Sequence, residues 1–102
     1  MKVIIGIPAY NEENNIGPIV AKLKKKYDHI LVCDDGSSDM TESIASSLGA
    51  LVVRHHKNLG YGGAIKTIFN EAKKIDGDLK IESEPGEGVR IILRFSKKLE
   101  NS

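Results

Sequence analysis

Residues 3–13 constrain the fold of this chain more than any other segment. They open with an apolar run rich in β-branched residues, which is typical of a strand buried on both faces of a sheet. Because proline has no amide hydrogen to donate to a neighbouring strand, we expect the strand to end at Pro8. In an open α/β sheet, the loop after such a strand borders the crevice where ligands bind. The polar loop that follows therefore either contacts a ligand or only starts the next helix, since Asn and Glu are common at helix starts.

Strand–loop–helix units follow one another up to residue 75. Apolar runs at 3–7, 30–33 and 51–53 predict strands, and apolar residues at helical spacing predict helices over 16–27, 39–48 and 64–75. Asp39 and Glu42 indicate a capping box at the start of the second helix, and Gly49 indicates its end. This repetition favours parallel strands joined by right-handed crossovers.

The pattern changes after residue 78. Apolar and charged residues alternate over 79–84, a turn is predicted at 85–88, and residues 89–95 return as an antiparallel strand. Matching the faces of the two strands predicts a register with the following pairs: Leu79 with Phe95, Ile81 with Leu93, and Glu84 with Arg90. Arg90 and Arg94 would then suit an exposed edge strand.

These elements predict a three-layer, Rossmann-like α/β fold with three helices and one mixed sheet. The expected strand order is 3-2-1-4-5, with the first four strands parallel and the last antiparallel. The first two helices should cover one face and the third helix the other, because the chain reverses direction after the third strand. The 102 residues suit one domain, made of a βαβαβα part over 2–74, a hairpin over 75–96 and a frayed tail over 97–102.

Composition narrows the class of protein. The formal net charge of +1 argues against a surface dedicated to nucleic acid, and no apolar run approaches the roughly 20 residues of a membrane span. The single cysteine, Cys33, excludes an internal disulfide and fits a reducing, cytoplasmic location. Because Cys33 follows an apolar run, we interpret it as a buried structural thiol. A monomer or a small homo-oligomer is expected.

Three segments, 7–13, 32–41 and 58–64, resemble in order and spacing the inverting glycosyltransferases of family 2, especially those that act on dolichyl or undecaprenyl phosphate. In that family the segments form the nucleotide-binding half of a GT-A fold. The resemblance implies that Pro8, Ala9 and Tyr10 line the base pocket, with Tyr10 against the base. An aromatic face is suited to such stacking.

The same resemblance implies nucleotide contacts for three carboxylates. Glu12 would lie near the ribose, and Asp35 would accept a hydrogen bond from the ring N–H of the base, with Asp34 as a further candidate. A carboxylate is an acceptor only and so matches a ring donor. The alternative is that Asp34 and Asp35 only cap the second helix.

The chain departs from the family at its metal motif, an Asp-x-Asp element that follows the fourth strand. Here Asp76 and Asp78 precede the expected strand and resemble a polar turn. We therefore expect no metal site and no catalytic residue, and we find no counterpart of the acceptor half. Mg²⁺ or Mn²⁺ would be needed only by an active transferase. His55 and His56 are adjacent on an extended connector, so a zinc site there is not expected.

Residues 73–96 resemble a second family, the end of a histidine-kinase ATPase domain, where a helix leads into a terminal hairpin. None of that family's ATP-binding segments precedes it, so the resemblance implies structure without kinase chemistry. The two resemblances together suggest an engineered or recombined chimera joined inside the third helix, near 72–75.

Three functional hypotheses follow. The favoured one is a fold chimera without catalytic activity. The second is a module that retains weak binding of a UDP- or GDP-sugar. The alternative from a different class is an active family-2 glycosyltransferase that moves a sugar from a nucleotide-sugar to a lipid phosphate.

Overall fold

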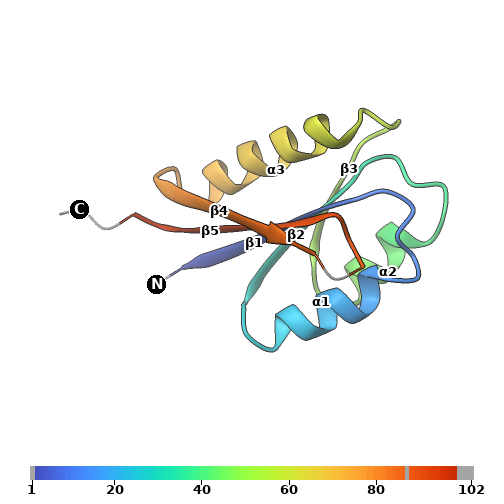
Figure 1. Cartoon of the computed structure of the whole chain (residues 1–102), viewed down its shortest axis with the longest axis horizontal. Helices are drawn as coiled ribbons and strands as arrows, with labels where there is room; N and C mark the ends of the chain where they lie inside the picture. The colour runs from blue at the N-terminus through green and yellow to red at the C-terminus, as the bar shows by residue number, and fades with distance from the viewer. Residues whose placement is uncertain (1, 87, 99–102) are drawn as a thin grey trace.

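The computed structural model describes residues 2–86 and 88–98, and they form one five-stranded sheet with helices on both faces (Figure 1). Its elements, in chain order, are β1 (Val3–Ala9), α1 (Ile16–Lys24), β2 (His29–Asp34), α2 (Thr41–Ser47), β3 (Leu51–Arg54), α3 (Tyr61–Ile75), β4 (Leu79–Pro85) and β5 (Ile91–Lys97). The three-layer fold class is confirmed. Of the predicted tail, Lys97 ends β5, and 99–102 lie outside the described residues.

The core has two parts, one on each face of the sheet. Helices α1 and α2 pack on one face and α3 on the other, as predicted (Figure 1). Strand β1 serves both parts because its side chains alternate: Ile5 and Ile7 face α1, while Ile4 faces α3. Gly6 allows α3 to approach closely, since a Cβ atom there would lie 2.4 Å from Ile68. No helix among those described has both the length and the apolar character needed to cross a membrane.

The order of the sheet is β3-β2-β1-β5-β4, so the predicted order of the last two strands was wrong. The predicted directions are confirmed, because β5 is antiparallel to both β1 and β4. Burial explains the exchange: β5 carries the buried Leu93 and Phe95, whereas β4 is exposed along almost all of its length. The apolar strand takes the interior position and the charged strand forms the edge.

The predicted hairpin register was also wrong. Ile81 pairs with Phe95 and Ser83 with Leu93, two residues away from the expected pairing. A shift of two residues keeps every side chain on its face, so matching the faces could not distinguish the two registers. Five residues, 86–90, connect the strands instead of a four-residue turn.

The prediction that Arg90 and Arg94 lie on an exposed edge strand was wrong as well. Arg94 lies on the interior strand β5, where its guanidinium is 3.1 Å from a carboxylate oxygen of Glu82 on β4. Arg90 precedes β5 and belongs to the connecting loop.

The predicted capping box of α2 was wrong, because the residue preceding the helix is Met40. Asp39 instead accepts hydrogen bonds from the amide and the hydroxyl of Thr41, and Glu42 lies 3.8 Å from Arg54. Gly49 follows the helix with a φ of +94°, which confirms the predicted helix end.

Candidate functional site

A pocket of about 320 Å³ opens at the carboxyl ends of β1 and β2, a volume at the low end for small-molecule sites. We call it the Tyr10 pocket. It is bordered by the loop after β1, the start of α3 and the loop before β5. Its lining residues are Pro8, Ala9, Tyr10, Glu12, Asp35, Asn58, Gly60, Tyr61, Ala64 and Arg90. The structure thus brings together all of the predicted nucleotide-binding residues except Asp34.

The residues from β1 are suited to contact a flat ligand. Ala9 is buried and ends the strand, while the Tyr10 side chain, 48% exposed, stands at the pocket with its ring accessible. Glu12 is half-buried, and its carboxylate accepts a hydrogen bond from the side-chain Nδ2 of Asn15 at 3.1 Å. An apolar floor, one accessible ring and a few polar groups are the usual elements of a small-molecule site.

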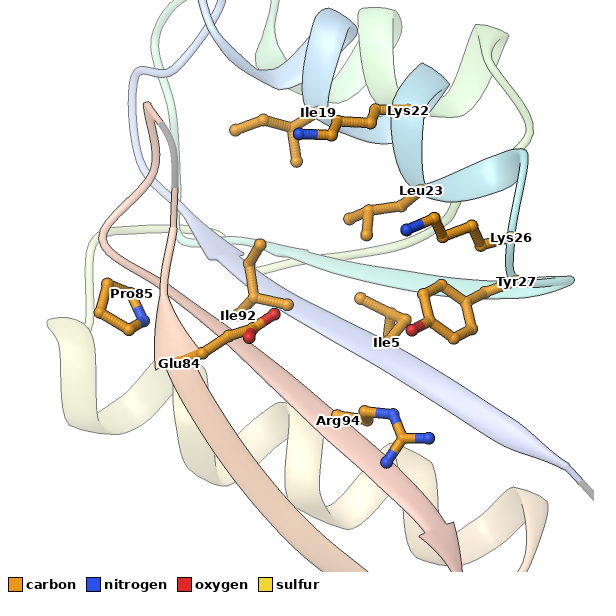
Figure 2. Close-up of a pocket in the computed structure, with 10 residues that line it drawn as sticks. All are labelled: Ile5, Ile19, Lys22, Leu23, Lys26, Tyr27, Glu84, Pro85, Ile92 and Arg94. Atoms are coloured by element: carbon orange, nitrogen blue, oxygen red, sulfur yellow. The ribbon is translucent and has the colours of Figure 1, made fainter.

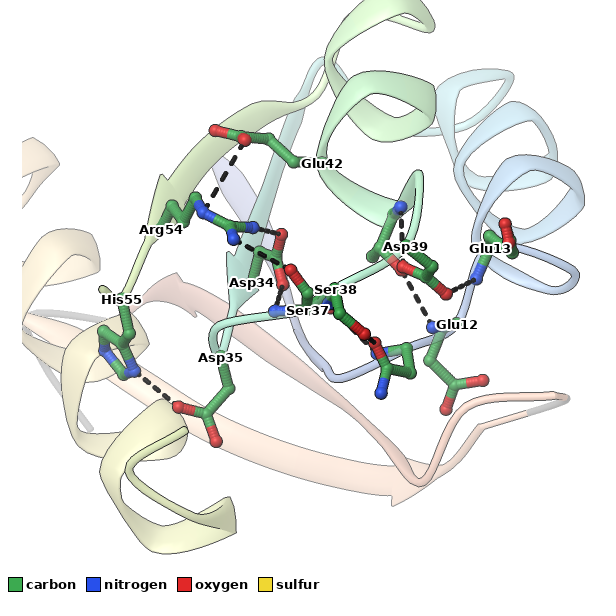
Figure 3. A network of polar contacts seen from close by, with 12 residues as sticks. Glu12, Glu13, Asp34, Asp35, Ser37, Ser38, Asp39, Glu42, Arg54 and His55 are labelled. Atoms are coloured by element: carbon green, nitrogen blue, oxygen red, sulfur yellow. Dashed lines mark hydrogen bonds and ion pairs between the residues drawn. The ribbon is translucent and has the colours of Figure 1, made fainter. Parts of the chain in front are cut away.

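Hydrogen bonds hold the loop after β1 to the loop after β2 (Figure 3). The Asn11 amide donates to the Ser37 hydroxyl at 2.8 Å, and the Asn11 side chain accepts from the Ser38 amide at 2.9 Å. Asn11 has a φ of +53°, a conformation that Asn tolerates better than most residues. Further along, the Glu12 amide donates to the Thr41 hydroxyl at 2.8 Å. The side chains of Asn11, Ser37, Ser38 and Thr41 therefore shape the loops, and none of the four lines the pocket.

Asp34 lies outside the lining of the Tyr10 pocket and is completely buried. One of its oxygens is 2.7 Å from the Arg54 guanidinium, and the other accepts from the Ser37 amide at 3.0 Å (Figure 3). Arg54 also donates to the Ser37 carbonyl at 2.8 Å. Asp34 therefore orders the loop after β2, and it does not cap α2, which begins only at Thr41.

Asp35 has more hydrogen-bonding partners than Asp34. Its Oδ1 lies 2.7 Å from Nδ1 of His55 (Figure 3). The same oxygen accepts from the Leu59 amide at 2.8 Å, and Oδ2 accepts from the Gly60 amide at 2.9 Å. The side chain is 3% exposed but still borders the pocket. A carboxylate has about four acceptor positions, so Oδ2 keeps one for a ligand.

His55 is the functional neighbour that sequence reasoning missed. Its ring is 10% exposed, and Nε2 lies 2.7 Å from the Thr67 hydroxyl on α3 and 3.6 Å from the Cys33 sulfur. Burial raises the pKa of the Cys33 thiol to about 12, with Asp35 and Asp34 adding to the effect. Cys33 is therefore the inert thiol that was predicted. No signal in the sequence pairs His55 with Asp35, since 20 residues separate them.

The residues do not fit a metal site at the Tyr10 pocket. Asp76 and Asp78 lie at the opposite end of the sheet, where they contact Lys97 at 2.9 Å and Lys98 at 3.6 Å. Within the described parts of the chain, no three His, Cys, Asp or Glu side chains are grouped so that they could hold an ion.

A second pocket, of about 300 Å³, lies between α1 and the residues of β1, β5 and β4 on the same face of the sheet (Figure 2). Lys22 and Lys26 extend over it from α1 and its C-terminal end, and Arg94 from β5 (Figure 2). It contains none of the residues that the family resemblance selects.

Comparison with known proteins relates the first three quarters of the chain to one family. The family model described as glycosyl transferase family 2 matches residues 4–74. An uncharacterized protein of Methanocaldococcus jannaschii is 46% identical over 67 residues. The UDP-N-acetylglucosamine–dolichyl-phosphate N-acetylglucosaminyltransferase of Methanococcus voltae is 32% identical over 93 residues, and the dolichyl-phosphate hexose transferase of Haloferax volcanii is 38% identical over 68.

These similarities cover 65%, 74% and 65% of this chain but only 28%, 37% and 28% of the respective relatives. The chain thus spans about a third of the length of these relatives. None of these matches supports the histidine-kinase resemblance of residues 73–96.

Proposed function

Because the chain belongs to glycosyl transferase family 2, we propose that it binds the nucleotide part of a nucleotide-sugar, UDP or GDP, in the Tyr10 pocket. The observation that carries this proposal is the convergence of Pro8, Ala9, Tyr10, Glu12 and Asp35 on one cavity. Hydrogen bonds between the loops hold this arrangement, so little ordering would be needed when a nucleotide binds.

Three of the lining residues have a direct role in the proposal. The accessible Tyr10 ring stacks on the base, and the remaining acceptor position of Asp35 receives the ring N–H. The half-buried Glu12 is the carboxylate nearest the chain's exit from β1 and accepts from a ribose hydroxyl. Asp34 supports the site only by holding the loop after β2.

We propose that the described residues bind the nucleotide part of a nucleotide-sugar but do not catalyse transfer of the sugar. The reason is that Asp76 and Asp78 are paired with lysines at the far end of the sheet, where they cannot neutralise a leaving diphosphate in the Tyr10 pocket. The alternative is transfer of a sugar to a lipid phosphate. It is favoured by the relatives of Methanococcus voltae and Haloferax volcanii, whose names describe transferases that use dolichyl phosphate.

Two further expectations from the sequence are also proposals. One is that the whole chain folds as a single domain. The other is a chimeric, engineered origin, which the comparisons leave without support. Neither alters the chemistry proposed for the Tyr10 pocket.

Calorimetric titration of the chain with UDP and with GDP, each with and without Mn²⁺, tests the proposal. We expect metal-independent binding that weakens roughly 5- to 150-fold in Tyr10→Ala, since stacking of a base on an aromatic side chain contributes about 1–3 kcal/mol. Met40→Ala is the matched control, because Met40 is 56% exposed and lies outside the pocket.

Three outcomes would contradict the proposal. Absence of binding would leave only a structural role for the pocket. Equal affinity of Tyr10→Ala and the unmodified chain would place the ligand elsewhere. Metal-dependent binding accompanied by release of sugar from a UDP- or GDP-sugar would establish the transferase alternative.

A further inference from the structure

We infer that Arg90 binds the diphosphate of the nucleotide and thereby gives the Tyr10 pocket its preference for a nucleotide over a nucleoside. This inference rests on the proposed function, and it extends that function to a residue outside the segment, 4–74, that matches the family. Arg90 comes from the loop between β4 and β5, at residues 86–90.

The strand order brings Arg90 to the pocket. In the antiparallel pairing of β5 with β1, Ile4 lies beside Phe95 and Gly6 beside Leu93. Continuing that register places Arg90 next to Ala9, the last residue of β1 and part of the pocket lining. With β4 beside β1, as the sequence predicted, the start of β5 would lie one strand, about 4.8 Å, farther away.

The loop that carries Arg90 is anchored in the core. The preceding residue, Val89, is only 5% exposed and packs with the α1 side of the core. Gly88 has a φ of +83° and lies against Asn15, so closely that a Cβ atom on it would be 3.1 Å from that side chain. The buried Val89 next to it therefore holds Arg90 at the pocket, although Arg90 itself is exposed.

A stacking contact orients the guanidinium. Its central carbon lies 4.0 Å from the centre of the Tyr61 ring, at the first residue of α3. Such a contact uses the face of the guanidinium and leaves its N–H edges available. Across the described parts of the chain, no carboxylate is within ion-pair distance of Arg90.

Binding of a diphosphate in the Tyr10 pocket requires a cation, because the pocket lining carries negative charges. The other charged residues of its lining are Glu12 and Asp35, both carboxylates, and Arg90 is the only cation among the described residues that line it. A nucleoside diphosphate would meet net repulsion there without Arg90. Guanidinium binds phosphate oxygens through two parallel hydrogen bonds, which suits a diphosphate better than a neutral ribose.

Calorimetry on the full chain with uridine and UDP, and in parallel with guanosine and GDP, tests the inference. EDTA in the buffer prevents a divalent ion from bridging the phosphates. The quantity compared is the ratio of the nucleoside Kd to the nucleotide Kd. We expect Arg90→Gln to reduce this ratio at least about tenfold, the effect of a charged hydrogen bond, without weakening nucleoside binding. Arg90→Lys should keep part of the ratio.

Arg94→Gln is the matched control, because Arg94 lies on the strand that follows Arg90, β5, but lines the other pocket. It should leave the ratio unchanged. If Arg90→Gln leaves the ratio intact, or weakens nucleoside and nucleotide equally, the inference about Arg90 is wrong while the proposed function stands. If the unmodified chain binds neither nucleoside nor nucleotide, both fail. Circular dichroism confirms that each variant is folded.

Discussion

Asp35→Asn tests how much the charge of the Asp35 carboxylate contributes to stability, because the asparagine side chain has nearly the same shape. Asp35 is 3% exposed and accepts three hydrogen bonds, from His55, Leu59 and Gly60. The Asn oxygen can replace Oδ1 opposite His55 and Leu59. Its NH₂ group then faces the Gly60 amide, where a donor meets a donor.

The magnitude follows from these contacts. Two hydrogen bonds change from charge-assisted to neutral, at a cost of about 1 kcal/mol each, and the third is lost at a cost of about 1–2 kcal/mol. The Gly60 amide keeps one acceptor, the Asn58 side chain at 3.0 Å, which limits the loss. We therefore expect the free energy of unfolding to fall by about 2–4 kcal/mol, equivalent to a Tm lower by roughly 10–25 °C.

Urea denaturation followed by circular dichroism measures this change. Asp28→Asn is the matched control, because the same atoms are exchanged at an exposed position and the expected change is within about 0.5 kcal/mol. The reasoning is refuted if Asp35→Asn is as stable as this control. That result would mean that the three hydrogen bonds contribute nothing beyond what an amide supplies.

Three further predictions concern the loops and the core around the pocket. Although burial acts in the opposite direction, hydrogen bonds from Thr41 and the Glu13 amide hold the pKa of Asp39 below its usual value. Its stabilising effect is therefore present above about pH 4 and lost as the pH falls through the lowered pKa, so Asp39→Asn should flatten the acid side of a stability–pH curve. Gly36→Ala should destabilise by more than about 1 kcal/mol in thermal unfolding, because φ is +77° and the added Cβ would lie 2.7 Å from the Asn58 amide nitrogen. With a pKa of about 12 and full burial, Cys33 should react with a thiol reagent at pH 8 only as fast as the chain unfolds, and rapid labelling of the folded chain would contradict this.

Local patterns predicted the elements of this fold well. The apolar run of residues 3–7 forms a strand buried on both faces, and the alternating segment after residue 78 forms an exposed one. The positions of Pro8, Ala9, Tyr10 and the end of β2 at one edge followed from the parallel order of the first strands, because parallel strands end at the same side of a sheet.

The placement of the last two strands could not be predicted in the same way. A hairpin has the same internal pairing whichever of its strands lies beside β1, and both registers bury the same faces. The difference lies in how much apolar surface each strand offers to two neighbours: of the apolar residues on the two strands, only Leu93 and Phe95 on β5 are buried.

The two adjacent aspartates show a similar limit. Neighbouring residues of an extended chain tend to point to opposite sides, and of Asp34 and Asp35 only Asp35 borders the Tyr10 pocket. Which one does so depends on partners distant in sequence. Arg54 forms an ion pair with Asp34, and His55 forms a hydrogen bond with Asp35. The sequence shows two adjacent aspartates, but contacts with residues distant in sequence determine which of them borders the pocket.

The interior position of β5 also bears on how the sheet assembles. β5 is the last of the described strands, yet it joins β1 to β4, with Val3 beside Ser96. The sheet can therefore be completed only by closing a loop that runs from Val3 to Ser96, a step whose entropy cost slows folding. During synthesis, one edge of β1 would remain unpaired until the segment around Ser96 has left the ribosome.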